Sequence, residues 1–448
     1  MRRRAGGAAV VCTARGCGDA LARWALYHVR CARFAEAHAY LDDPVEAEDA
    51  AKRMRALGLR AAVVRAGEEE QEASSGRGAG EEEAEGASRA LPPEVFVVPC
   101  DSALRAAWTQ QRNWPKLAPY AGLKDGGRRA LEVQARQELN AAHCATRCSA
   151  RGVGWLLHVD ADELWFSPRG VGAGEHFEAL SAAGISTYVY KNLEGVPGGA
   201  GDRAGGGGAA DEGTPSATPS ALSAPGGDPF SAVTLFRRSP GDVLMGDVSD
   251  EVYERVAFWR RRTPHAQYFL GYDNGKAAVC LSEAGGPPVP LSVHEWLPPS
   301  AEALMRGAHG VPGLDTGGAL RYDPAVALGE PVILHFIDCG FEWWWAKYRL
   351  LGDFPDSWFG GHAPIPQCFH LASRDAIGRD SDSDAARRLY DQAIALRDAS
   401  EAQAQIDAGV CERIVGASDL LRAALREAMV MRAALDVTAD IDEQVFDV

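Results

Sequence analysis

The sequence lacks any hydrophobic run approaching the length that a membrane-spanning helix needs. It is also poor in positive charge, with 46 basic against 62 acidic residues and a formal net charge of −16. A nucleic-acid-binding protein needs a basic face to displace counterions, so this balance argues against that class. It does not argue against a nucleotide ligand, because a metal ion and a few basic side chains are enough to hold a diphosphate.

The ten cysteines show no framework spacing, which argues against a disulfide-stabilised or cysteine-rich zinc domain. One local group, His143, Cys144 and Cys148, has the residue types of a zinc site. A fourth ligand at a recognisable spacing is missing, so small buried thiols are the favoured interpretation.

The chain has 448 residues and is 46% hydrophobic, enough for one large or two ordinary domains with a full core. Residues 67–90 are acidic and rich in glycine and serine, and residues 197–228 are rich in glycine, alanine, proline and serine. Neither segment has enough apolar surface to offset the entropy of ordering it. Both are predicted to be disordered insertions in surface loops.

Strands and helices are predicted to alternate in the first part of the chain, which indicates an α/β fold with a mainly parallel sheet covered on both faces. The expected strands are 8–13, 36–41, 60–65, 94–99 and 155–159, and the expected helices are 18–33, 45–57 and 128–149. Residues 185–295 are strand-rich, and "PVILHFIDCGFEWWWAKYRLL" predicts a strand, a turn and a helix. Residues 384–434 predict two appended helices that serve packing or oligomerisation.

The stretch "GWLLHVDADELWF" places Asp160, Asp162 and Glu163 directly after an apolar strand. Three carboxylates so close together repel one another unless a positive group lies between them, and a hard divalent cation prefers carboxylate oxygens. A solvated acidic turn is disfavoured by the apolar residues on both sides. A phosphatase-type Asp-x-Asp is disfavoured by Leu164, where Ser, Thr or Val is expected, and by the position of the strand in mid-chain. The Asp-x-Asp of a nucleotide-sugar glycosyltransferase remains the leading interpretation.

At this point the sequence resembles the GT-A fold glycosyltransferases of the family 92 and family 2-like type, over residues 8–375. The pieces that carry the resemblance are "DALARWALYHVR", "HAYLDDP", "QELNAAHCATRCSARGVGWLLHVDADELWF", "YVYKNLEGVP", "GKAAV", "SVHEW", "ILHFIDCGFEWWWAKYRLLGDF" and "FHLASRD". Their order along the chain is more specific than any single piece. The resemblance implies a Rossmann-like GT-A fold with a mixed, mostly parallel sheet flanked by helices, followed by the C-terminal helical segment.

The resemblance also implies roles for particular residues. Asp42 or Asp43 would face the nucleotide. Asp160 and Asp162 would hold Mn²⁺ or Mg²⁺, with Asp160 also reaching the ribose. The third metal ligand would be His335 or His294, of which His335 is favoured by its strand-then-aromatic context. Further phosphate contacts are expected from Lys276 and Lys347, although the surrounding residues depart from the family pattern.

Family 92 transfer is inverting, so a general base is expected to deprotonate the acceptor hydroxyl. Glu295 and Asp338 are candidates because each closely follows a motif histidine. The expected function is transfer of a sugar from a UDP-sugar, UDP-galactose by resemblance, to a glycan. The alternatives are an inactive GT-A scaffold and, less favoured, a metal-dependent phosphohydrolase. A Golgi-lumenal location is expected if an N-terminal anchor is missing from this chain, and a soluble intracellular one otherwise.

Overall fold

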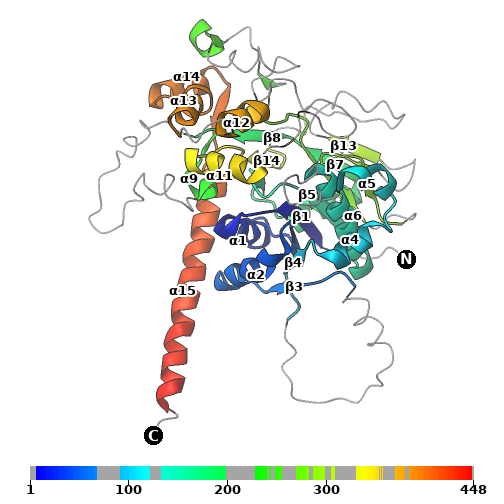
Figure 1. Ribbon diagram of the computed structural model, residues 1–448. Coiled ribbons are helices and arrows are strands. Elements are labelled where there is room, and N and C mark those ends of the chain that lie inside the picture. Colours follow the sequence, from blue (N-terminus) through cyan, green and yellow to red (C-terminus); the bar gives the residue numbers. More distant parts are fainter. Residues whose placement is uncertain are drawn as a thin grey trace, which may run out of the picture.

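The computed structural model in Figure 1 shows sheets enclosed by helices, with one long helix, α15, extending away from the body. It describes residues 7–67, 91–121, 133–197, 228–239, 242–243, 248–254, 269–281, 286–297, 304–307, 329–352, 354, 356, 369–378 and 383–445. The two predicted insertions, 67–90 and 197–228, lie outside the described residues except for Gly67, Pro197 and Asp228.

The larger sheet has eight strands in the order β13-β7-β10-β5-β1-β2-β4-β3. Every neighbouring pair is parallel except the two pairs made by β10, which runs against β5 and β7. This confirms the predicted α/β class and the mixed, mostly parallel sheet. The strands are β1 (Ala8–Ala14), β2 (Glu36–Leu41), β3 (Ala61–Val63), β4 (Val95–Pro99), β5 (Trp155–His158), β7 (Ile185–Tyr190), β10 (Lys276–Cys280) and β13 (Leu304–Gly307).

Helices cover both faces of this sheet. Successive side chains of β1 point to opposite sides, so they pack into two different cores. Val10 and Cys12 pack into a core shared with α1, α2 and α7, and Ala9 and Val11 pack into a second core shared with α4, α5 and α6. These helices are α1 (Gly18–Leu26), α2 (Ala47–Ala56), α4 (Ser102–Trp108), α5 (Trp114–Ala121), α6 (Val133–Arg151) and α7 (Ala173–Ala182).

A second sheet has five strands in the order β15-β9-β8-β14-β6. It consists of β6 (Glu163–Phe166), β8 (Asn192–Gly195), β9 (Leu235–Arg237), β14 (Val332–His335) and β15 (Cys411–Arg413). Short strands β11 (Val289–Pro290) and β12 (Trp296–Leu297) form a separate pair. The remaining helices are α9 (Pro229–Ala232), α11 (Phe341–Leu351), α12 (Phe369–Gly378), α13 (Ser383–Ala393), α14 (Ala399–Asp407) and α15 (Gly416–Val445).

The C-terminal segment differs from the expected pair of appended helices. It contains α13, α14 and α15, and between the last two the strand β15 pairs with β9 and extends the second sheet. The short "CER" strand has no alternating pattern of its own, and only its partner strand makes it a strand. This part of the chain therefore completes the fold.

Most predicted strands lie where expected, but several helices and strands begin or end at other residues than predicted. The helix expected over 18–33 ends at Leu26 and continues as a π-helical turn, η1 (Tyr27–Cys31). A 3₁₀ turn, η2 (Pro44–Glu46), precedes α2 because Pro44 fits the first helical position. "PLSVHEW" bends at residues 291–294, which separates β11 from β12. In the described part of the chain, no helix is both long enough and apolar enough to cross a membrane.

Candidate active site at the junction of the two sheets

The Asp-x-Asp turn lies where the chain passes from one sheet to the other. The strand β5 belongs to the large sheet and β6 to the small one, and Asp160, Ala161 and Asp162 lie in the connection between them. The Glu163 carboxylate accepts a hydrogen bond from the backbone N–H of Asp160, 2.7 Å away, which closes the turn. Apolar residues on both sides thus fix two aspartates at the carboxyl end of a parallel strand, where ligands bind in open α/β sheets.

Asp160 is paired with a buried lysine. Because β10 runs against β5, it begins beside the end of β5, and this places Lys276 at the turn. Lys276 Nζ donates to Asp160 Oδ2 at 2.7 Å, and Gln137 Nε2 of α6 donates to Oδ1 at 2.5 Å. Burial alone would raise the pKa of Asp160, but the Lys276 ammonium outweighs it and holds the pKa well below its usual range. Asp160 is therefore ionised at neutral pH.

Asp162 has a second lysine and a histidine as neighbours. Lys347 Nζ, from α11, donates to Asp162 Oδ2 at 2.9 Å and to the backbone oxygen of Ile337 at 3.0 Å. His335 Nε2 lies 3.8 Å from Asp162 Oδ1. Burial opposes ionisation of Asp162, yet Lys347 and then His335 lower its pKa. Burial lowers the pKa of His335 to about 4, so its imidazole is neutral at pH 7 and suited to bind a metal.

His335 is the middle member of a buried row across the small sheet. It pairs in register with Glu163 on β6 and with Glu194 on β8, so the three side chains share one face. The segment 270–272 covers this row. Glu194 accepts from the backbone N–H groups of Leu270 and Gly271 at 2.7 and 2.6 Å, and the Tyr272 hydroxyl donates to Glu163.

A metal fits this group only in part. His335 Nδ1 is buried and has no hydrogen-bond partner among the described residues. No hydrogen bond at Nδ1 therefore fixes the ring, and the ring can turn to present Nε2 to an ion. Asp162 and His335 supply one oxygen and one nitrogen ligand on the same side of the turn. Asp160, by contrast, is held by Lys276 and Gln137. In the described structure, Asp160, Asp162 and His335 do not bring three ligand atoms within 4.8 Å of one another.

The other predicted nucleotide and metal ligands are near the same end of the sheet but are engaged differently. The Asp42 carboxylate is bound by Arg136 Nε and Nη2 at 2.5 and 2.8 Å. Asp43 accepts from the Val45 N–H at 3.2 Å and caps η2. His294 Nδ1 hydrogen-bonds the Gly275 carbonyl at 2.8 Å, and its ring lies 4.3 Å from that of Tyr272.

The two candidate bases have different surroundings. Asp338 is buried, and neither carboxylate oxygen has a hydrogen-bond partner among the residues that the structure describes. Burial raises its pKa well above the usual range, which favours the protonated acid over a base. Glu295 is half-buried in the bend before β12, and burial raises its pKa as well. Among the described contacts, no hydrogen bond or ion pair joins Glu295 to Asp160 or Asp162.

Several side chains of structural importance escaped the sequence reasoning, among them Gln137, Tyr272 and His38. Gln137 and Tyr272 reach the site from a helix and a loop with no motif around them, and the only available signal was the polar face of the helix around Gln137. His38 takes the place that the sequence suggested for His143. His143 Nδ1 instead hydrogen-bonds the Tyr40 hydroxyl at 2.8 Å, whereas His38 Nε2 lies 3.4 Å from Cys148 Sγ.

No protein-family model matches the chain, and no curated protein matches it. A solved structure of core-mannan synthase A from Aspergillus fumigatus, in its Mn/GDP form, is similar over 44% of this chain, with 9% sequence identity and a TM-score of 0.21. The match spans 45% of that protein's chain, which is less than half of its length. None of these comparisons assigns the chain to a family.

Proposed function

We propose that the chain is a metal-dependent glycosyltransferase with a GT-A-type fold that transfers a sugar from a nucleotide-sugar donor. The observation that carries the proposal is the junction of the two sheets, where an ionised aspartate faces a neutral histidine and two lysines meet the same turn. Carboxylate oxygen and neutral imidazole suit Mn²⁺ or Mg²⁺, and ammonium groups suit the oxygens of a diphosphate.

Each residue has a distinct task in this proposal. Asp162 and His335 hold the ion, with Asp160 as the third ligand once it is released by Lys276 or Gln137. A bound Mn²⁺ or Mg²⁺ would neutralise the charge that develops on the departing diphosphate. Lys347, whose side chain is 24% exposed, is accessible enough to exchange Asp162 for a phosphate oxygen. Lys276 is fully buried and keeps its contact with the turn.

The donor is proposed to be a UDP-sugar, UDP-galactose in particular, and the acceptor a glycan. Asp42 is engaged by Arg136, so Asp43, at the same strand end, is assigned to the ribose. Inverting transfer needs a base at the acceptor hydroxyl. Glu295 is the better of the two candidates, because it is half-buried, whereas full burial raises the pKa of Asp338 well above its usual range.

A second function, a catalytically inactive GT-A scaffold, is favoured by one observation. Lys276 and Lys347 already neutralise Asp160 and Asp162, so the turn is stable without a metal ion. A scaffold of this kind would bind a nucleotide-sugar through the partly exposed Lys347 ammonium group, without Mn²⁺ and without turnover.

The two functions separate in one assay. The protein is incubated with UDP-galactose and other UDP-sugars, with and without Mn²⁺, and UDP release is measured for wild type and Asp162→Asn. A transferase releases UDP only with the metal, and loss of this electrostatic stabilisation in Asp162→Asn lowers the rate on the order of a hundredfold, about 3 kcal/mol. Asp391→Asn, an exposed position on α13, is the matched control and keeps the wild-type rate.

A UDP-dependent rise in melting temperature without Mn²⁺ and without UDP release would favour the scaffold. A melting temperature that ignores both Mn²⁺ and every UDP-sugar would reject both functions.

A further inference from the structure

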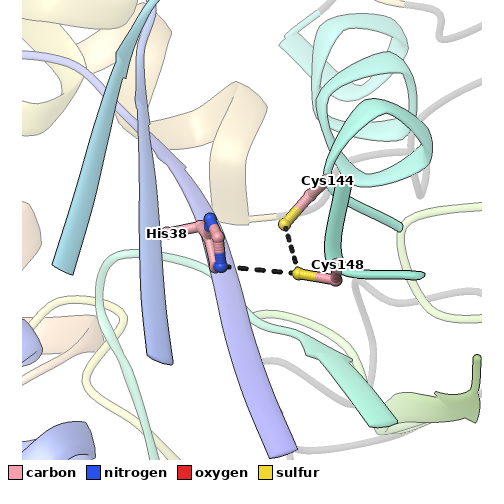
Figure 2. A group of neighbouring side chains, drawn as sticks. All are labelled: His38, Cys144 and Cys148. Atoms are coloured by element: carbon pink, nitrogen blue, oxygen red, sulfur yellow. Dashed lines mark hydrogen bonds between the residues drawn. The ribbon is translucent and has the colours of Figure 1, made fainter. Parts of the chain in front are cut away.

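A second polar cluster is buried between β2 and α6, away from the Asp-x-Asp turn. Figure 2 shows His38 on the strand pointing toward Cys144 and Cys148 on the helix. All three side chains are fully buried, and a ring nitrogen and the two sulfurs lie within 4.8 Å of one another. In the part of the chain that the structure describes, no other group brings three His, Cys, Asp or Glu ligand atoms so close together.

Two of the three separations match those of a tetrahedral zinc site. Two Zn–S bonds of about 2.3 Å at the tetrahedral angle place the sulfurs about 3.8 Å apart, and a Zn–S and a Zn–N bond place their atoms about 3.6 Å apart. Cys144 Sγ and Cys148 Sγ are 3.8 Å apart, and Cys148 Sγ and His38 Nε2 are 3.4 Å apart. Residues four apart lie one above the other on a helix, so the two thiols converge without strain.

The charges around the cluster also suit a cation bound by thiolates. Glu36 Oε2 lies 3.1 Å from His38 Nε2, and Arg151 Nη2 holds the other Glu36 oxygen at 2.7 Å. Glu36 is 16% exposed and Arg151 27%, so this edge of the cluster reaches the surface and offers an ion a way in. Binding must displace the thiol protons, so it weakens as the pH falls.

We propose that His38, Cys144 and Cys148 form a structural site for Zn²⁺ or a comparable thiol-seeking cation. Binding replaces the two thiol protons by two metal–sulfur bonds and releases two protons to solvent. No acceptor lies at His38 Nδ1 among the described residues, so the ring lacks the usual supporting hydrogen bond, and the affinity should be about tenfold to a hundredfold below that of a supported site.

The site would fasten α6 to β2. Gln137, which holds Asp160, lies two helical turns before Cys144 on the same face of α6, and Arg136 beside it holds Asp42 at the end of β2. A metal at the cluster would therefore stabilise the position of the helix that orients the Asp-x-Asp turn. The inference does not depend on the proposed transferase activity.

The test uses the whole chain with Co²⁺ and Zn²⁺ as probes. Co²⁺ bound by thiolates gives a sulfur-to-metal charge-transfer band in the near ultraviolet, which carboxylate ligands do not give. We expect this band at one equivalent of Co²⁺, its loss on adding one equivalent of Zn²⁺, and a rise of several degrees in melting temperature with Zn²⁺. Asp162→Asn should keep the charge-transfer band, which separates this site from the Asp-x-Asp turn.

Cys148→Ala should lose the band and the zinc-dependent rise in melting temperature. Cys411→Ala, an equally buried cysteine outside the cluster, should keep both. If wild type shows no charge-transfer band, or if Cys148→Ala keeps it, the site is wrongly assigned. The wild-type measurement decides even if a variant fails to fold.

Discussion

Replacing Lys276 by methionine keeps most of the length of the side chain but removes its charge. Lys276 is fully buried, donates to Asp160 at 2.7 Å and lies 3.6 Å from Glu163. The variant leaves Asp160 ionised beside Asp162 without its ammonium partner. Breaking a buried ion pair from one side costs about 3–5 kcal/mol. Because Asp160 is itself 25% exposed and keeps some hydration, we expect the lower end, about 3 kcal/mol of unfolding free energy at pH 7.

The pH dependence gives the stronger test. In wild type the pKa of Asp160 lies below its unfolded value, so its contribution to stability is present above about pH 4 and is lost as the pH falls further. Without Lys276, burial dominates and raises the pKa of Asp160 above the unfolded value. Protonation then stabilises the folded variant as the pH falls from 7 toward 4. The difference in stability between wild type and variant should therefore shrink with acid.

The assay is urea denaturation of wild type, Lys276→Met, Asp160→Asn and the double variant at pH 7 and pH 5. Asp160→Asn should recover most of the stability that Lys276→Met loses, because the uncompensated charge is gone. Lys52→Met, on the exposed face of α2, is the matched control and should change stability by less than about 0.5 kcal/mol. A loss below about 1 kcal/mol in Lys276→Met, or no recovery in the double variant, would refute the assignment of this ion pair.

Two further predictions concern the scaffold. Gly275→Ala should lose about 3 kcal/mol of unfolding free energy, because φ is +76° and the new Cβ would lie 2.0 Å from the Tyr190 carbonyl oxygen. Gly58→Ala, where φ is also +76° but the surrounding space is open, should lose only about 1–2 kcal/mol. Equal losses of the two variants in urea denaturation would contradict the steric argument. His28 is buried, its pKa is lowered to about 3, and it accepts a hydrogen bond from the Trp165 N–H. As the pH drops below about 6.5, the unfolded chain therefore binds a proton at His28 before the folded chain does, and the unfolding free energy falls. Denaturation curves at pH 7, 6 and 5 should show that His28→Gln loses less unfolding free energy per pH unit than wild type, by up to about 1.4 kcal/mol, and an equal pH dependence would contradict a neutral His28.

Local patterns were sufficient to predict much of the framework. The apolar runs that became β1, β2 and β5 are short, bounded and buried, and such runs determine a parallel strand with little help from the rest of the chain. The position of Asp160 and Asp162 follows directly, because they come next in the sequence after a strand. His335 lies 3.8 Å from Asp162, and its choice over His294 as a metal ligand stays a prediction.

Partners distant in the sequence could be identified only in the folded chain. Arg136 engages Asp42 from 94 residues away, and Lys347 engages Asp162 from 185 residues away, so no local spacing reveals either pair. The same holds for β15, which is a strand because β9 offers it an edge.

The cysteine cluster shows the division most clearly. The sequence by itself determined that Cys144 and Cys148, four residues apart in a helical segment, share a face. It also placed His143 next to Cys144, but neighbouring residues on a helix point about 100° apart, so His143 faces Tyr40 instead. Only the packing of α6 on β2 brought in His38, because the choice of which strand residue meets a helix face depends on how the two elements are docked.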